Sequence, residues 1–171
     1  MTPQRPTQLK LIAELHPGGV KVHHVEVVHE RVVAPSHIVG PFVYQVTGTG
    51  RVLHMETMTD PLVERGFGTP KQGGHAIRHA TAAVISVRIP LPAAEVPADL
   101  EVSFFRGTDA MPRTHGELHI LLEQHHKVGP PTAPPGLQKL HTLSLAELRA
   151  IPGWTQHLHA AGLRDPGGKP P

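Results

Sequence analysis

Proline and glycine interrupt this 171-residue chain at intervals that leave only short apolar runs between them. The sequence contains 19 prolines and 17 glycines, and within the runs apolar and polar residues alternate. Alternation with a period of two places the apolar side chains on one face of a β-strand, whereas an amphipathic helix needs a period near 3.6. The pattern therefore predicts an all-β protein of short strands joined by turns.

Seven segments carry the strand pattern, and glycine-rich turns such as Thr47–Gly50 separate several of them. Short strands joined by tight turns are typical of an Ig-like antiparallel β-sandwich. Alternation also predicts that Val102, Leu118, Ile120 and Leu122 point into the core. The expected strands are Gln8–Leu15, Lys21–Val33, Phe42–Val46, Arg51–Met58, Ala80–Ile89, Leu100–Arg106 and Glu117–Glu123.

The composition changes after Lys127. Residues 129–136 include four prolines, which favour an extended polyproline conformation and cannot contribute to a sheet. Ser144 and Glu147 then have the capping-box spacing that opens a short helix. We therefore expect a β-sandwich domain over 1–127, a Pro-rich linker over 128–143, a short C-terminal helical arm over 144–164 and a disordered tail over 165–171.

A single tryptophan, Trp154, lies in the expected arm, close in sequence to Leu148 and Ile151. A lone tryptophan among apolar neighbours is more often an anchor than an exposed side chain. We expect Trp154 to be buried, and the three residues to form a partner-binding surface. The expected partner is another protein or a second copy of the chain in a homo-oligomer.

Charge and hydropathy exclude several classes of protein. The chain has 16 Lys and Arg against 14 Asp and Glu, and its basic residues are dispersed, which argues against a nucleic-acid interface. No segment approaches the roughly 20 apolar residues of a membrane span. The N-terminal segment lacks an apolar stretch of secretory length, so we expect a soluble, cytoplasmic protein.

Histidine is the functional side chain that the sequence offers most often, with fifteen copies against no cysteine. Without thiolates, imidazole and carboxylate are the strong metal ligands available, and they suit zinc, nickel or copper ions. We expect no bound cofactor, with a site for one of these ions as the alternative. The candidate metal ligands are His24, Glu26, His54, Glu56, His75, His79, His115, Glu117 and His119.

The spacing of these candidates decides what they can do. Two histidine pairs have four-residue spacing, which suits chelation on a helix but separates the side chains by roughly 13 Å on a strand. Three His/Glu pairs have two-residue spacing and would share the outer face of a strand, roughly 6.6 Å apart. A solvated ladder of ion pairs is the simpler interpretation of these three pairs. The histidine pairs are His75/His79 and His115/His119, and the His/Glu pairs are His24/Glu26, His54/Glu56 and Glu117/His119.

No catalytic motif is complete in the sequence. His29-Glu30 begins like the zinc-protease motif H-E-x-x-H, but Val33 stands where the second histidine must be. None of the four serines has the flanking glycines of a nucleophile elbow. We therefore predict no catalytic residue and favour a protein without enzymatic activity.

Four short motifs occur in order in the first two thirds of the chain: Tyr44-Gln45-Val46, Gly50-Arg51-Val52-Leu53, Arg65-Gly66-Phe67 and Val87-Arg88-Ile89-Pro90. Through them the segment Phe42–Arg106 resembles the N-terminal β-sandwich domain of IgA-peptidase-like metallopeptidases. The catalytic domain of that family has no counterpart in this sequence, so the resemblance transfers no protease residue. It implies a sandwich module used for attachment or packing.

Together, these observations favour a non-enzymatic β-sandwich module that binds or assembles through protein–protein contacts. Its histidines add an expected pH sensitivity, because full protonation would raise the net charge from +2 to +17 (2 plus 15). The alternative is a His/carboxylate metal-binding protein that serves metal storage or metal-dependent hydrolysis.

Overall fold

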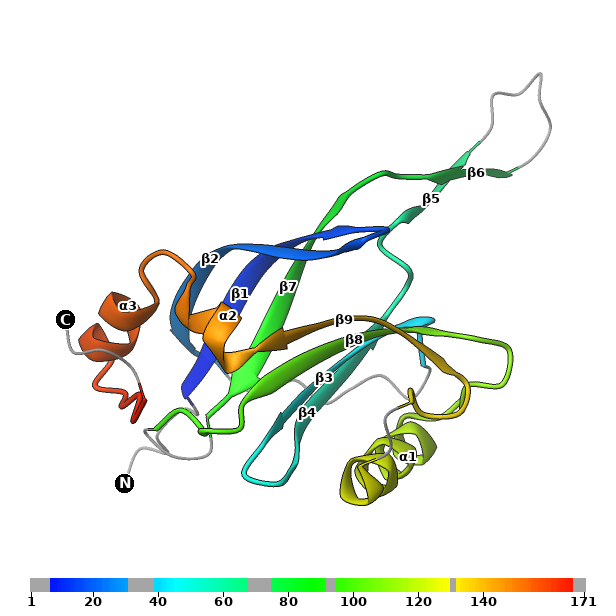
Figure 1. Cartoon of the computed structure of the whole chain (residues 1–171). Helices are drawn as coiled ribbons and strands as arrows, with labels where there is room; N and C mark the ends of the chain where they lie inside the picture. Colours follow the sequence, from blue (N-terminus) through cyan, green and yellow to red (C-terminus); the bar gives the residue numbers. More distant parts are fainter. Residues whose placement is uncertain (1–6, 31–38, 68–74, 92–94, 130–131, 168–171) are drawn as a thin grey trace.

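The computed structural model describes residues 7–30, 39–67, 75–91, 95–129 and 132–167, which form nine strands and three helices. Two antiparallel sheets enclose the main hydrophobic core between them (Figure 1). The expected β-sandwich architecture is therefore confirmed. None of the described helices has the length and apolar character needed to cross a membrane.

The first sheet has the strand order β2-β1-β7 and comprises β1 (Thr7–His16), β2 (Gly19–His29) and β7 (Ala83–Pro90). Every second residue of β1 from Leu9 to Leu15 is fully buried, as alternation predicts. The pairing of β1 with β2 shifts between Ile12 and Ala13, where β2 contains one extra residue. This bulge explains why the apolar alternation of the second strand is irregular.

The second sheet has the strand order β4-β3-β8-β9, and both of its faces are covered. On β3, Phe42 and Val46 belong to the core between the sheets, whereas Val43 packs in a second apolar cluster under helix α1. All seven residues of β3 are consequently buried. The four strands are β3 (Phe42–Gly48), β4 (Arg51–Met58), β8 (Glu101–Gly107) and β9 (Leu137–Ser144).

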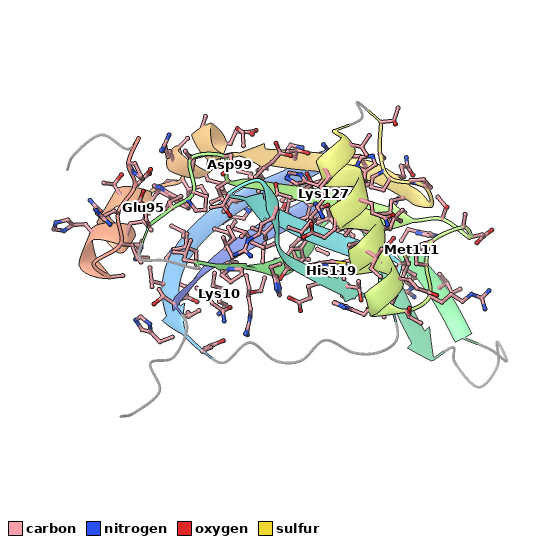
Figure 2. All side chains as sticks on the ribbon, turned by 90° about the horizontal axis from the view of Figure 1, so that it is seen from below. Lys10, Glu95, Asp99, Met111, His119 and Lys127 are labelled. Carbon is pink, nitrogen blue, oxygen red and sulfur yellow. The ribbon has the colours of Figure 1, made fainter. Side chains whose placement is uncertain are left out.

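Helix α1 (His115–Val128) replaces the strand that we expected over Glu117–Glu123. The Thr114 hydroxyl accepts a hydrogen bond from the backbone N–H of Glu117 and caps the first turn. Gly129, with φ at 63°, adopts the left-handed conformation that ends the helix. Figure 2 shows α1 crossing the strands of the second sheet. The strand prediction was wrong. The helix instead covers the face of the second sheet that points away from the first sheet.

The apolar spacing explains the error. Leu118 and Leu122 are four residues apart, which fits one face of a helix as well as one face of a strand, and both are buried in the second cluster. Ile120 distinguishes the two structures, because only a strand would place it on the same face. It is 57% exposed, so its expected place in the core was wrong.

The C-terminal segments belong to the sandwich. The expected linker 128–143 differs from the structure from Leu137 onward, where β9 begins and pairs with β8 as far as Ser144. The predicted capping box then opens α2 (Leu145–Arg149), and α3 (Trp154–Ala160) follows.

The expected arm also shares its core with the expected sandwich domain 1–127. Leu148, Trp154 and Leu158 are buried in the cluster that contains the inward-facing residues of both sheets. Asp165, in the expected disordered tail, accepts hydrogen bonds from Arg149 and Trp154. Residues 168–171 lie outside the described residues.

A hairpin formed by β5 (Val63–Phe67) and β6 (His75–His79) projects from the sandwich (Figure 1). We expected no strand between Met58 and Ala80, and a strand from Ala80 onward. The strand β6 instead ends at His79, and β7 begins only at Ala83. The two hairpin strands pair with each other and with no other strand of the described residues.

Candidate functional site

The α1-facing surface of the second sheet changes from apolar to charged along its two central strands. Three cross-strand pairs of β3 and β8 follow one another on this surface, and side chains of such pairs lie side by side. The apolar end is packed against α1, and the polar end extends under the last turn of the helix. The three pairs are Val43/Phe105, Gln45/Ser103 and Thr47/Glu101.

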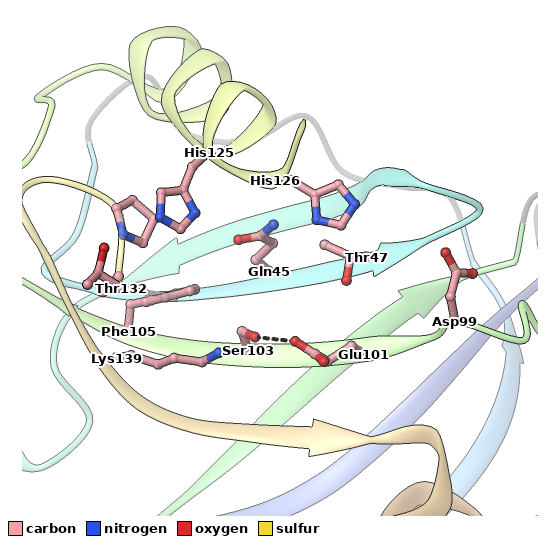
Figure 3. A pocket seen from close by; sticks show the side chains of 12 residues that line it. Gln45, Thr47, Asp99, Glu101, Ser103, Phe105, His125, His126, Thr132 and Lys139 are labelled. Carbon is pink, nitrogen blue, oxygen red and sulfur yellow. Dashed lines mark hydrogen bonds between the residues drawn. The ribbon is translucent and has the colours of Figure 1, made fainter. Parts of the chain in front are cut away.

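This polar end forms the floor of a pocket of about 230 Å³, which we call the polar pocket. The last turn of α1 and the segment 132–134 form its roof, and Asp99 lies at one end of it (Figure 3). The pocket is lined by Gln45, Thr47, Asp99, Glu101, Ser103, Phe105, His125, His126, Thr132, Ala133, Pro134 and Lys139.

The polar groups of the floor are buried. Gln45, Ser103 and Thr47 are only 6%, 7% and 9% exposed, respectively. The Ser103 hydroxyl lies 3.2 Å from Glu101 Oε1, to which it donates a hydrogen bond, and 3.1 Å from the Thr142 hydroxyl. Buried polar groups need such partners, because desolvation without them costs free energy. These bonds orient the floor of the polar pocket.

Asp99 ties the end of the pocket to the turn between β3 and β4. Its carboxylate accepts hydrogen bonds from the backbone N–H of Thr49 at 2.7 Å and of Gly50 at 2.8 Å. The bond from Gly50 is the largest cause of a pKa of Asp99 below its usual value, and the bond from Thr49 is the next largest. The charge of the nearby His126 lowers this pKa by a smaller amount. Asp99 is therefore ionised at neutral pH and contributes a negative charge to the pocket.

His125 is the unusual group of the roof. Its Nε2 atom is buried and has no hydrogen-bond partner among the described residues. The imidazole points from the last turn of α1 toward the pocket (Figure 3). Buried nitrogens are normally hydrogen-bonded, so this atom is an exception among the described polar groups of the pocket.

The predicted metal ligands are distributed over separate parts of the fold. His24 and Glu26 lie on β2 in the first sheet, where Glu26 pairs with Lys10 at 2.8 Å and His24 packs edge-on against His157. The hydrogen bond from Lys10 is the main cause of a lowered Glu26 pKa. Glu26 thus forms a surface ion pair with Lys10.

His54 and Glu56 lie on β4 in the second sheet. We expected their side chains on the outer face of the strand, and this prediction was wrong. Their partner is Tyr44, whose hydroxyl donates to Glu56, lies 3.4 Å from His54 Nε2 and accepts the backbone N–H of Arg88 at 3.1 Å. Burial raises the pKa of Tyr44 well above its usual range, and the hydrogen bond from His54 is the main cause of the lowered Glu56 pKa. Register places both residues on the first-sheet side of β4, because His54 pairs with Val46 and Glu56 with Tyr44.

His115, Glu117 and His119 lie on α1, so the strand spacing assumed for them was wrong. On a helix His115 and His119 are neighbours. The imidazole of His115 hydrogen-bonds to the backbone of Met55, while its Nε2 is buried without a partner among the described residues. Burial is the main cause of its lowered pKa, and the charges of His119 and His54 lower it further.

His75 and His79 lie on β6, where four-residue spacing has the strand separation that we expected. The structure therefore brings no two of the predicted His/Glu pairs into one site. Across the part of the chain that is described, no group of three or more His, Asp or Glu side chains could hold a metal ion.

The expected partner-binding residues face the interior. Trp154 is 1% exposed, so its expected burial is confirmed, and Leu148 and Ile151 are also buried. The Trp154 indole N–H donates to Asp165 at 3.1 Å. A partner would reach these three residues only after α2 and α3 had left the core.

Sequence reasoning missed the polar pocket because it placed the second face of β3 and β8 in solvent. A signal was available: Phe42-Val43-Tyr44 and Phe104-Phe105 are apolar on consecutive positions, which predicts a strand covered on both faces. The interruption of these runs by Gln45 and Ser103 marks where the cover becomes polar.

Comparison with protein-family models, with curated proteins and with solved structures finds no match for this chain.

Proposed function

We propose that this chain is a non-enzymatic binding module that holds a small polar molecule in the polar pocket. The observation that carries the proposal is the combination of a buried hydrogen-bonding floor with two imidazoles on the roof of one pocket. Gln45, Thr47 and Ser103 present amide and hydroxyl groups, and the imidazoles of His125 and His126 line the pocket from the end of α1 (Figure 3). Ligand sites commonly combine such a concave surface with a few convergent polar groups.

Binding of small polar metabolites to the full chain tests this function by nuclear magnetic resonance. We expect millimolar additions of a binding compound to shift the backbone amides of Gln45, Ser103 and Lys139. Ser103→Ala removes one hydroxyl from the floor and should weaken binding about fivefold to tenfold. The control His159→Gln, on the exposed side of α3, should leave binding unchanged.

The proposal is wrong if no compound in a panel of amino acids, polyols, amines and carboxylates shifts these amides at about 10 mM. This concentration is close to the dissociation constant of the weakest binding that the proposal includes. It is also wrong if the shifts that appear are confined to other surfaces.

Protein–protein assembly is the second function that we propose, and one observation favours it. The β5–β6 hairpin projects from the body, with Ile77 64% exposed, and Val84 on β7 is 71% exposed. A two-stranded hairpin is marginally stable by itself and gains stability from a packing partner. The use of the sandwich for attachment, its Ig-like character and its relationship to IgA-peptidase-like metallopeptidases stay predictions.

A further inference from the structure

The charged side chains of the polar pocket are divided between its two ends. Asp99 and Glu101 contribute carboxylates near the start of β8, and Lys139 contributes an ammonium group from β9 (Figure 3). Neither Glu101 nor Lys139 forms an ion pair within the described ranges, although both line the same pocket. Two opposite charges therefore remain available to a ligand.

Strand register sets the separation of these charges. Lys139 pairs with Phe105, which lies four residues after Glu101 on β8, so the two backbone positions are roughly 13 Å apart. The Lys139 side chain extends back along the floor toward Ser103, which shortens the gap between the two charged groups (Figure 3). The remaining gap suits a ligand whose opposite charges are a few bonds apart.

The volume of the pocket limits the size of this ligand. The pocket, at about 230 Å³, is smaller than the roughly 300–1,000 Å³ of pockets that hold drug-sized ligands. A ligand that fills it is therefore a small molecule, in the size range of a free amino acid.

We infer that the ligand of the polar pocket is a zwitterion of amino-acid size, with its ammonium group at Glu101 and Asp99 and its carboxylate at Lys139. This inference rests on the proposed binding function. The hydroxyls and amide of the floor accept or donate the remaining hydrogen bonds. A dianion would be repelled by the two carboxylates, and a diamine would be repelled by Lys139.

Isothermal titration calorimetry of the full chain with matched probes tests the inference. The zwitterions are 4-aminobutyrate and threonine, and the comparison compounds are pentanoate, pentylamine and erythritol, which lack the ammonium group, the carboxylate or both charges. We expect one zwitterion to bind at least about tenfold more tightly than all three, since hydrogen bonds to charged groups are stronger than those between neutral groups.

Charge variants then assign the two ends. Glu101→Gln and Lys139→Gln should each weaken zwitterion binding about tenfold, and Glu101→Gln should not weaken pentanoate binding. The control Lys127→Gln removes an exposed charge of α1 outside the pocket lining and should have no effect. Far-UV circular dichroism verifies that each variant is folded. Lys139 is exposed, so Lys139→Gln should fold and test the inference even if Glu101→Gln unfolds.

The outcomes separate the two proposals. Tightest binding of erythritol, or zwitterion binding that both charge variants leave unchanged, overturns the inference while the binding function stands. Absence of binding by all five probes and by the wider panel overturns both.

Discussion

Asp165 holds two side chains of the C-terminal region at once. Its carboxylate accepts hydrogen bonds from Arg149 Nε at 3.0 Å and from Trp154 Nε1 at 3.1 Å, and its side chain is only 9% exposed. The bond from Arg149 is the main cause of a pKa of Asp165 below its usual value. Ionised Asp165 therefore stabilises the fold above the unfolded-state pKa, and this stabilisation is lost as the pH falls through the folded-state pKa.

We expect Asp165→Asn to lower the free energy of unfolding by about 1–3 kcal/mol at pH 7, because Arg149 loses its charged partner. Urea denaturation at several pH values should show this difference from the wild type shrinking below about pH 4. Glu95→Gln is the control, since its partner Arg164 is 79% exposed and such surface pairs contribute little. A difference that stayed constant down to pH 3 would contradict the role of the ionised carboxylate.

His115, at the start of α1, differs from Asp165 because its surroundings disfavour its charged form. Burial is the main cause of its lowered pKa, so the unfolded chain binds a proton here at a higher pH than the folded chain does. Between these two pKa values the unfolded state holds more protons. Folding stability therefore falls as the pH is lowered below about 6.5, the ordinary imidazole value.

The variant His115→Gln should retain more of its pH 7 stability at pH 5 than the wild type retains, because it lacks this buried imidazole. Thermal unfolding at pH 7, 6 and 5 measures the difference. His159→Gln, which removes an exposed imidazole of α3, should follow the wild type. Equal pH dependence of wild type and His115→Gln would show that other groups cause the acid sensitivity.

Among the elements, β9, α2 and α3 decide whether the sandwich has a complete core. β9 is hydrogen-bonded along β8, and α2 and α3 contribute Leu148, Trp154 and Leu158 to the core between the sheets. Removal of a buried tryptophan side chain alone costs about 3–5 kcal/mol, and a domain is stable by only about 5–15 kcal/mol. These elements are too large a part of the core to be dispensable.

A chain that ends at Gly136 should therefore lose cooperative unfolding. Circular dichroism during heating measures this loss, which we expect as the absence of a sharp transition. Gln156→Ala changes an exposed side chain of α3 and should keep the transition of the full chain. A truncated chain that still melted cooperatively with a β spectrum would restore the expected independence of the sandwich from its C-terminal arm.

For the whole molecule, association through the projecting hairpin is the property that pH should affect most directly. The hairpin strand β6 begins and ends with histidine, and Ile77 lies between them. Protonation of the fifteen histidines raises the charge of the chain toward +17 (2 plus 15), so copies of the molecule repel one another more strongly in acid.

We expect any oligomer present at pH 7.5 to dissociate at pH 5.5 and to be weakened at pH 7.5 by Ile77→Asp. Sedimentation velocity at matched ionic strength measures both effects. Ile120→Asp, on the exposed side of α1, is the matched control for a newly introduced charge and should leave the oligomer intact. Association that neither acid nor Ile77→Asp weakens would place the contact elsewhere on the surface.

Elements with a local signal were predictable from the amino-acid sequence. Period-two alternation identified the inward Val102, and the capping box located α2, because these patterns reflect each segment's own geometry. The apolar pattern of the segment that forms α1 was equally local, but the spacing of Leu118 and Leu122 fits both a strand and a helix. There the tertiary contact of Leu118 and Leu122 with the second sheet decided for the helix.

The polar pocket and the place of the C-terminal region depend on long-range contacts. The pocket combines β3, β8, β9 and the end of α1, which are far apart in the sequence. The apolar runs of β3 and β8 indicate that both faces of these strands are covered, but they do not indicate which segments cover them. The proline-rich composition of residues 129–136 predicted a boundary, but the pairing of Leu137–Ser144 with β8 made the following residues part of the same sheet. Strand pairing and core packing are long-range interactions, so they can assign a segment a role that its composition does not indicate.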